Sequence, residues 1–588
     1  MCGIVGFVSR SGQSPDLAEA MHRPLQTLVS RGPDDEGVWV DPIAGVALAA
    51  RRLAITDLSD ASQQPMHSAD GRWHVVFNGH IAGHHELRKK LAANLGLASQ
   101  SDTATLVALI SCFGMAETLP MLEGQFAIAA WDAYTETLHL ARDRFGVRPL
   151  VYGETNQGVG FASTTRAWSL LPGADRRLDP RAKELFASLG WVPPPMTIYG
   201  QARALLPGHR LEVQSNRQIK QEVWWSESAA VALAEDHLMG PSALEAIIDA
   251  RIREQLEADR RVGVLLSGGI DSSIIASSPA VREASLPAFV ATFPNAKSFD
   301  ESEHARQVAD ALGLPLTEVE MTDERIQESA DRLGTAYDEP FADASALPTL
   351  ALTREVAQHC TVALSGDGGD ELFGGYRRHA VLSMRSALPR ALRSIAGLLP
   401  GRLGEACRSD TEHEAWCALI RMQGSHDAID DPTDNASGLH GALRRDTCLA
   451  LPGDLLVKMD RAAMASSLEV RTPLLTAAVH AAAWSLPDMY RRPPVLNSGK
   501  LILRQMLKSR IPGVRFERRK QGFAAPLGEW LRGPLRAWVQ DLPLEPLGSS
   551  GDPGQCLQAV LSGDDRQLPQ LWLCATFAAW HSQHDKMS

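Results

Sequence analysis

Two patterns of apolar residues divide the chain. In the first part, short apolar or alternating runs are separated by turn residues, as in residues 125–131, 138–141, 150–152 and 159–162. Runs of this length are typical of antiparallel strands. They favour an α+β domain in which two stacked antiparallel sheets are covered by helices.

From Pro241 onward, segments with helical periodicity alternate with short apolar runs. The pattern predicts helices over residues 243–256, 272–278 and 302–312 and strands over residues 262–266, 288–292, 316–320 and 362–364. Pro279 is a natural stop for the second of these helices. Such alternation predicts an α/β domain, a parallel sheet with helices on its faces.

Proline-rich and polar stretches lie between the two patterns, including residues 191–195 and the segment from Leu206 to Trp225. These residues interrupt regular structure. We therefore expect a first domain over residues 1–205, a linker over 206–240 and a second domain over 241–588.

Composition narrows the class of protein. The 588 residues are 44% hydrophobic and 22% charged, which is ordinary for a soluble globular protein, and a net charge of −12 does not suggest a nucleic-acid partner. We find no apolar run of membrane-spanning length and no signal-peptide pattern. The eight cysteines are scattered without a Cys-x-x-Cys pair. We expect a cytoplasmic protein with reduced thiols and without a membrane partner.

The most informative stretch is residues 262–273, an apolar strand followed by a loop and a helix. Glycines in such a loop let the backbone approach a ligand, and the amides at the helix start favour an anion. The motif Ser-Gly-Gly-x-Asp-Ser resembles the pyrophosphate loop of the ATP pyrophosphatase superfamily. The resemblance implies that ATP is bound by Leu266, Ser267, Gly268, Gly269, Asp271 and Ser272. The alternative is an ordinary glycine-rich βα turn.

A second glycine-rich turn, residues 365–376, follows the strand that ends at Leu364 and carries three carboxylates. Carboxylates beside a triphosphate are suited to Mg²⁺. By resemblance, Ser365 and Gly366 also contact ATP, Asp271 and Asp370 hold the metal, and Asp367 faces the acceptor substrate. The alternative is a solvated acidic turn.

A cation near the α-phosphate would stabilise the charge that develops in adenylation. We choose Lys458, within the motif of residues 457–473. Lys500 and Lys520 carry the same charge, and only the motif selects Lys458. A surface lysine is the alternative.

The chain begins Met-Cys-Gly-Ile. Removal of Met1 would place the Cys2 thiol beside a free α-amine, which is a usable base at neutral pH. A cysteine at this position alone would more often be a small buried hydrophobe. Residues 31–35, 52–55, 77–79 and 101–103 accompany it, and the ordered set resembles the class II glutamine amidotransferase domain, an N-terminal nucleophile hydrolase with the αββα fold.

The resemblance gives each of these residues a role. Cys2 would be the nucleophile, Arg52 would bind the glutamine carboxylate, Asn78 and Gly79 would form an oxyanion hole, and Asp102 would hold the glutamine ammonium. Each also has a structural alternative. Asn-Gly is a common hairpin turn, Arg52 could be a surface cation, and Asp102 could cap the following helix.

Taken together, the motifs resemble the glutamine-hydrolysing asparagine synthetase B family over nearly the full chain, including residues 298–302, 337–343 and 519–523. The second domain would then be similar to the adenine nucleotide α-hydrolases. Two positions depart from the family. His80 replaces a glutamate that lines the glutamine pocket, and Thr476 replaces a common aspartate. The first predicts altered glutamine affinity, and the second leaves open a structural change or a different acceptor.

The resemblance implies that ammonia released from glutamine amidates ATP-activated aspartate through an internal passage. It also implies that the products are asparagine, glutamate, AMP and pyrophosphate. The cofactors are ATP and Mg²⁺, and we expect a homodimer. Three alternatives stay open. These are a tailoring amidotransferase that acts on a sugar acid or peptide, a macrocyclase that uses only adenylation, and a catalytically inactive binding protein.

Overall fold

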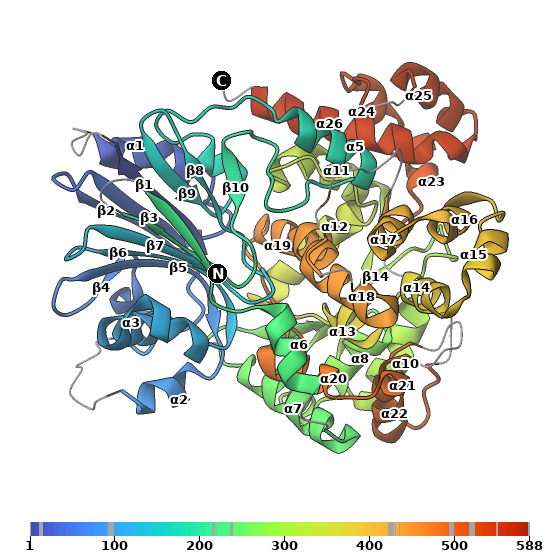
Figure 1. Ribbon diagram of the computed structural model, residues 1–588, viewed down its shortest axis with the longest axis horizontal. Helices are drawn as coiled ribbons and strands as arrows, with labels where there is room; N and C mark the ends of the chain where they lie inside the picture. Colours follow the sequence, from blue (N-terminus) through green and yellow to red (C-terminus); the bar gives the residue numbers. More distant parts are fainter. Residues whose placement is uncertain are drawn as a thin grey trace.

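The computed structural model describes residues 2–10, 16–91, 99–214, 218–235, 239–421, 429, 431–433, 436–492, 499–516, 524–547 and 551–585. Figure 1 shows two halves packed side by side, a β-rich N-terminal half and a helix-rich C-terminal half that contains a third sheet. The motifs that accompany Cys2 and the two glycine-rich loops therefore lie in different halves of one molecule.

Two antiparallel sheets make up the N-terminal half. The first has the order β10-β8-β9-β1-β3-β2 and the second β12-β11-β7-β6-β5-β4. Their strands are β1 Cys2–Ser9, β2 Asp35–Asp41, β3 Val46–Arg52, β4 Met66–His67, β5 Trp73–Ile81, β6 Gly124–Asp132, β7 Thr137–Arg142, β8 Val151–Glu154, β9 Gly158–Ala162, β10 Ala202–Ala204, β11 His209–Val213 and β12 Ile219–Val223.

The burial of β1 follows from its position between two layers. Ile4 and Val8 pack between the two sheets, whereas Val5 and Phe7 pack in the cluster that lines the helical side of the first sheet. Because both faces are covered, every residue of β1 is buried and the strand is apolar without alternation. Helix α3 (Asp102–Thr118) and β5 share a further apolar cluster on the outer side of the second sheet. The predicted αββα layering is thus confirmed.

The C-terminal half contains a five-stranded parallel sheet with the order β15-β14-β13-β16-β17. The strands are β13 Val262–Leu265, β14 Ala288–Thr292, β15 Leu316–Glu320, β16 Val362–Leu364 and β17 Glu469–Arg471. The first four confirm the predicted strands. The last was not predicted, because a single apolar residue between two charged ones does not indicate a buried strand.

Helices surround these sheets (Figure 1). In the N-terminal half and the segment after it they are α1 Leu17–Gln26, α2 His84–Lys89, α3, α4 Thr165–Trp168, α5 Pro180–Leu189 and α6 Glu227–Glu235. Around the parallel sheet they are α7 Pro241–Glu254, α8 Ile270–Ser277, α9 Pro279–Glu283, α10 Ser302–Leu312, α11 Asp323–Ala336, α12 Ala346–His359, α13 Gly369–Phe373, α14 Arg377–Ala387, α15 Arg390–Ala396, α16 Gly401–Arg408, α17 Glu412–Ile420 and α18 Gly438–Arg445. They continue with α19 Leu456–Met464, α20 Ala477–Trp484, α21 Asp488–Arg491, α22 Leu501–Arg510, α23 Leu527–Arg532, α24 Arg536–Asp541, α25 Pro553–Leu561 and α26 Leu568–Asp585.

Among the described residues, the helical segment Asp102–Met121 passes a length and hydropathy test for a membrane span. However, 56% of its most apolar window is buried inside the protein. Its apolar side chains pack with those of β5 and β6. This packing is that of a core helix.

The segment between the halves is more regular than its sequence indicates. His209–Val213 and Ile219–Val223 fall in the predicted linker and form β11 and β12, which extend the second sheet beyond β7. These strands carry charged residues at alternate positions, which resemble a polar linker in sequence. The division of the chain at residues 205 and 240 stays a prediction.

A buried ion network joins the two halves. Arg31 of the first half donates two hydrogen bonds to the Asp460 carboxylate of α19, at 2.8 and 3.1 Å. Arg461 also donates to Asp460, at 2.8 Å, and Arg148 lies 3.6 Å away. The side chains of Arg31 and Asp460 are only 4% and 3% exposed. Burial by itself would raise the pKa of Asp460, but these guanidinium groups hold it far below its ordinary value.

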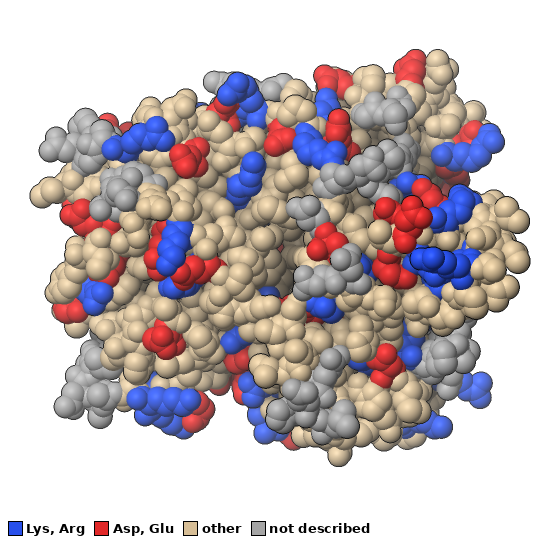
Figure 2. Space-filling model, viewed as in Figure 1, with Lys and Arg blue, Asp and Glu red and all other residues tan. Residues whose placement is uncertain are grey.

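Acidic and basic side chains are interspersed over the outer face seen in Figure 2. Most surface ion pairs of this kind contribute little to stability. The buried network around Asp460 is therefore expected to contribute more to stability than these surface pairs.

Replacing Asp460 tests that network. Asp460→Asn keeps the shape of the side chain and removes its charge, so the buried Arg31 loses its partner. Breaking a buried pair in this way costs about 3–5 kcal/mol. We expect a clear fall in the midpoint temperature of unfolding, measured by circular dichroism.

The matched control is Asp564→Asn, which breaks a pair with the exposed Arg566 at the surface. Its unfolding midpoint should equal that of the parent. The same midpoint for Asp460→Asn would contradict a stabilising role of the interdomain network.

Candidate active sites

The start of β1 lines a pocket of about 360 Å³, a volume that includes the space at the pocket opening. Cys2 lines it together with the predicted glutamine-site residues Arg52, Gly79 and Asp102. These residues come from β1, β3, β5 and the first turn of α3. The structure therefore brings together four residues that are separated by up to 100 positions in the sequence.

Asn78 lies directly against Cys2. Its Oδ1 accepts a hydrogen bond from the Cys2 backbone N–H at 3.1 Å. Its Nδ2 is buried and has no hydrogen-bond partner among the described residues. An unpaired buried donor beside a nucleophile is suited to a developing oxyanion. Asn78 and Gly79 lie inside β5, so the alternative of an Asn-Gly hairpin turn is excluded.

The Cys2 thiol is buried, and burial raises its pKa above the ordinary value for cysteine. Gln64 Nε2 lies 3.7 Å from the sulfur, and Gln64 Oε1 accepts a hydrogen bond from the Phe77 backbone N–H at 2.7 Å. Because a buried thiol stays protonated, it needs a base beside it to become a nucleophile.

Arg52 is buried at the pocket wall rather than exposed on the surface. Its Nη1 donates to Asp35 Oδ2 at 2.8 Å, and its Nη2 donates to the backbone carbonyl of Asp57. A guanidinium has five N–H groups. The two intramolecular bonds orient the side chain and leave further donors for a ligand carboxylate.

Asp102 also faces the pocket. Its carboxylate accepts backbone hydrogen bonds from Ile81 at 3.1 Å and from Thr103 at 2.8 Å. The residue that caps α3 is Ser101, whose side chain accepts from Ala104 N–H, so the capping alternative for Asp102 is not needed. Asp102 is left as a buried carboxylate beside a pocket that could hold a cation.

His80 lies next to this carboxylate, with Nδ1 3.6 Å from Asp102 Oδ2. Burial and then the nearby charge of Arg471 lower the pKa of His80, so its imidazole is neutral at neutral pH. Burial would raise the pKa of Asp102, but hydrogen bonds from His80 and from the Ile81 backbone N–H lower it, so it stays ionised. The carboxylate therefore keeps its charge for a ligand.

The far wall of the pocket comes from the other half of the molecule. Glu469 and Arg471 of β17 line it, and Arg471 Nε donates to Glu469 Oε1 at 2.6 Å. The carbonyl of Arg471 accepts a hydrogen bond from Ser365 N–H at 2.8 Å. Arg471 thus links the Cys2 pocket to the first residue of the second glycine-rich loop.

The first glycine-rich loop, which contains Ser267, Gly268 and Gly269, follows β13, as predicted. Ser267 Oγ accepts a hydrogen bond from Gly269 N–H at 3.3 Å and lies 3.1 Å from Ser272 Oγ. Gly268 has a φ of +70°, and a Cβ there would lie 2.5 Å from Ala305 N. Only glycine fits this position. Helix α8 begins at Ile270, two residues earlier than predicted.

The two glycine-rich loops meet, as expected for loops at the carboxyl ends of adjacent parallel strands. A Cβ on Gly366 would lie 2.8 Å from Asp271 Cβ, and one on Gly369 would lie 2.2 Å from Asp271 Oδ1. Ser365 Oγ donates to Asp367 Oδ2 at 2.6 Å. The loops could not approach this closely if either glycine carried a side chain.

Lys500 lies between the two carboxylates that the sequence assigns to a metal. Its Nζ contacts Asp271 Oδ2 and is 2.7 Å from Asp370 Oδ1. Asp271 Oδ1 is buried without a hydrogen-bond partner among the described residues. Two close carboxylates around a cation are the donor set that Mg²⁺ prefers. The residues present therefore fit a magnesium ion.

Lys458 lies in the same half but contacts Asp343 and Ser345 instead of Asp271 and Asp370. Its Nζ contacts Asp343 Oδ2 at 2.8 Å and Ser345 Oγ at 2.9 Å. Burial would lower the pKa of Lys458, but Asp343 and Asp454 raise it, with a smaller contribution from Asp367. The ammonium is thus charged and paired. Lys520 and the motif over residues 519–523 lie outside the described residues.

Sequence reasoning missed four residues of the two sites. Gln64 carried no motif, and β17, which supplies Glu469 and Arg471, was not predicted as a strand. Lys500 was considered only for its charge. A signal for Lys500 was its place directly before the helical segment at Leu501, but the sequence does not reveal that this helix end faces Asp271.

Thr476 has a structural role. Its side chain accepts a hydrogen bond from Val479 N–H at 3.3 Å and caps the N-terminus of α20. Aspartate caps helices in the same way. The departure from the family at this position therefore preserves a helix cap.

Two family models match the chain. The glutamine amidotransferase domain model matches residues 1–225, and the asparagine synthase model matches residues 243–582. The match to the second model covers more than half of the chain.

Relatives share most of this length. A Bacillus subtilis protein named asparagine synthetase [glutamine-hydrolyzing] 1 is 28% identical over 99% of this chain and 96% of its own. Asparagine synthetase [glutamine-hydrolyzing] 3 of the same bacterium is 26% identical over 90% of this chain and 89% of its own. A Gibberella zeae protein named amidase chry2 is 27% identical over 74% of this chain and 66% of its own.

Among solved structures, a glutamine phosphoribosylpyrophosphate amidotransferase from B. subtilis has 16% sequence identity to this chain and a TM-score of 0.29. The match covers 54% of this chain and 66% of the other. The family predicted from the motifs is confirmed by the family models, together with its enzyme class, a glutamine-dependent ligase that uses ATP. The chain belongs to the asparagine synthase family.

Proposed function

We propose that this protein hydrolyses glutamine at Cys2 and uses the ammonia to convert ATP-activated aspartate into asparagine. One observation carries the proposal. Arg471 lines the Cys2 pocket, and its carbonyl accepts a hydrogen bond from Ser365 N–H in the second glycine-rich loop. A glutaminase pocket and an adenylation site that share one residue are arranged for transfer of ammonia.

In the glutaminase half, removal of Met1 frees the α-amine of Cys2 as the base for the buried thiol. The sulfur attacks the glutamine amide, and the unpaired Nδ2 of Asn78 stabilises the oxyanion with the Gly79 amide. Arg52 binds the substrate carboxylate, and Asp102 binds its ammonium. Ammonia leaves, and water hydrolyses the glutamyl thioester.

In the synthetase half, the loop at Ser267 binds the phosphates of ATP, with Asp271 and Asp370 as the residues that would hold Mg²⁺. The ion would neutralise phosphate charge and orient the phosphates. Asp367 faces the acceptor. Lys500 Nζ lies between the two carboxylates, where the ion would have to displace it. We propose that the displaced ammonium then stabilises charge on the phosphates during adenylation, a role that the sequence assigns to Lys458.

Ammonia must reach the acyl-adenylate as the neutral base. We propose that it travels inside the protein past Arg471, the residue that the two sites share. Attack on the acyl-adenylate then gives the amide and AMP. Pyrophosphate leaves in the earlier adenylation step.

A second candidate is a related amidotransferase with another acceptor acid. The similarity to a fungal protein named as an amidase favours it. Neither departure from the family adds support, because Thr476 caps α20 and His80 lies beside Asp102 in the Cys2 pocket. We therefore place aspartate first.

We also propose a cytoplasmic location, since all eight cysteines are free. The homodimer stays a prediction.

The first experiment tests the coupled activity. Purified protein is given ATP, Mg²⁺ and glutamine, with and without aspartate, and pyrophosphate and the nitrogen product are measured. Aspartate-dependent pyrophosphate with asparagine is expected. Glutamate without aspartate-dependent pyrophosphate would move the assignment to another acceptor.

Cys2→Ala should lower glutamine-supported asparagine synthesis by about 1,000-fold or more, because no other thiol can form the thioester. Synthesis from ammonium and the aspartate-dependent release of pyrophosphate should persist. Cys112→Ala, at an exposed cysteine, is the control and should change neither rate. Glutaminase activity retained in Cys2→Ala would contradict the assignment.

Lys500→Met and Lys458→Met separate the two lysines. We expect Lys500→Met to slow aspartate-dependent pyrophosphate release by about 100-fold or more, because it removes a cation beside the phosphates. Lys458→Met should slow it less. Circular dichroism checks that both variants fold. The reverse order of effects would restore the sequence-based choice of Lys458.

His80→Glu restores the residue that the family usually carries. A second carboxylate beside Asp102 adds an acceptor for the glutamine ammonium. We therefore expect KM for glutamine to fall about tenfold, with kcat nearly unchanged. Thr476→Asp should leave both constants unchanged, since both residues cap α20. An unchanged or higher KM in His80→Glu would show that the histidine does not limit glutamine affinity.

A further inference from the structure

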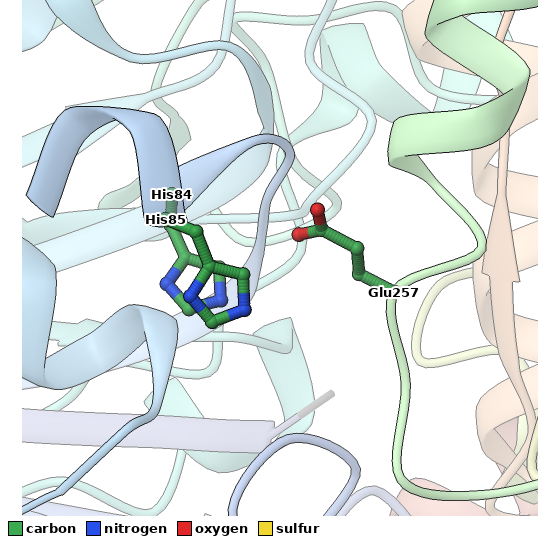
Figure 3. A group of neighbouring side chains, drawn as sticks. All are labelled: His84, His85 and Glu257. Atoms are coloured by element: carbon green, nitrogen blue, oxygen red, sulfur yellow. The ribbon is translucent and has the colours of Figure 1, made fainter. Parts of the chain in front are cut away.

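Two histidines and a glutamate lie close together where the halves meet. His84 and His85 begin α2, directly after the strand that carries Asn78, and Glu257 lies in the loop after α7. One potential ligand atom from each residue lies within 4.8 Å of the others. Figure 3 shows the Glu257 carboxylate directed toward the two imidazole rings.

Two atoms of this cluster lack hydrogen-bond partners among the described residues. His84 is fully buried, and its Nε2 has no hydrogen-bond partner among the described residues. Glu257 Oε2 is a buried atom in the same situation. The other ring nitrogen of His84, Nδ1, lies 3.4 Å from Thr105 Oγ1. Metal-binding histidines commonly have this arrangement, in which one nitrogen is held by a neighbour and the other is free.

Charged side chains of both signs surround the cluster. Glu254, one turn before Glu257, is already paired, because Arg251 Nη2 lies 2.6 Å from Glu254 Oε1. The buried Oε2 of Glu257 has no such partner among the described residues, so this oxygen is available as a ligand.

We propose that His84, His85 and Glu257 bind a divalent transition-metal cation of the zinc type, with a fourth position open to water. Two imidazoles and a carboxylate are a common zinc ligand set. Bond lengths near 2.1 Å place tetrahedral ligand atoms about 3.4 Å apart. The ligand atoms, which lie within 4.8 Å of one another, would therefore have to approach by at most about 1.4 Å on binding.

The bound ion would clamp the two halves. It joins the start of α2 to the segment that also supplies the Gln255 and Glu257 carbonyls. Arg471 Nη1 donates to these carbonyls at 2.7 and 2.8 Å. Because Arg471 lines the Cys2 pocket, the metal would help to fix one wall of that pocket.

Zinc binding by the full-length protein tests the proposal. Protein stripped with a chelator is titrated with Zn²⁺ against a chromophoric zinc indicator, in excess Mg²⁺ to fill the carboxylate site. We expect one tightly bound zinc per chain. His85→Ala and Glu257→Gln should each weaken binding by about 100-fold. His85 is exposed, so this variant should fold.

The controls are His22→Ala and Glu86→Gln, an exposed histidine and an exposed glutamate outside the cluster. Both should bind zinc as the parent does. Zinc should also raise the unfolding midpoint of the parent more than that of either cluster variant, because it binds only the folded protein.

Substitution of Co²⁺ identifies the ligands. The proposal predicts a visible spectrum without a thiolate charge-transfer band. A thiolate band would place the ion at cysteines and overturn the proposal. So would unchanged zinc affinity in both cluster variants, or a parent protein that binds no zinc.

Discussion

The bidentate contact between Arg31 and Asp460 is the interaction on which the arrangement of the two sites depends. Arg31 Nε also lies 3.4 Å from the Cys2 carbonyl, so the guanidinium that crosses the interface holds the backbone of the nucleophile as well. Arg461 extends the network to Asp338, whose carboxylate accepts from Thr165 N–H at 2.6 Å. Charges buried this deeply are stable only while every partner is in place. The network therefore specifies one relative position of the halves.

That position gives Arg471 its importance. It belongs to the last strand of the parallel sheet, yet its side chain lines the pocket of the other half. Its carbonyl holds Ser365, and its guanidinium holds the loop around Glu257. One residue thus contacts the glutaminase pocket, a nucleotide loop and the loop that carries the proposed metal ligand. A displacement of β17 would therefore change the geometry of the pocket and of both loops.

The sequence was sufficient to predict those parts of the molecule whose structure depends on neighbouring residues alone. The run from Val262 to Leu266 predicted a strand, and the glycines after it predicted the tight loop that the structure contains, because a residue such as Gly268 has a backbone angle that other residues avoid. Cys2, Asn78 and Asp102 could be singled out from the order of their motifs. Cys2 and Asp102 line one pocket, and Asn78 accepts a hydrogen bond from the Cys2 backbone, which agrees with the resemblance that suggested all three.

Tertiary structure decided what depends on contacts between distant segments. The strand at Val470 exists because β16 pairs with it. Its flanking charges are stable there because Glu469 and Arg471 pair with each other and Arg471 also donates to the Gln255 and Glu257 carbonyls. The position of Lys500 between Asp271 and Asp370 depends on how α22 packs, which no local pattern records. Sequence alone thus determined the family and the chemical groups, since motifs fix residue types. The interface decided which groups meet, because ion pairs and packing act between residues hundreds of positions apart.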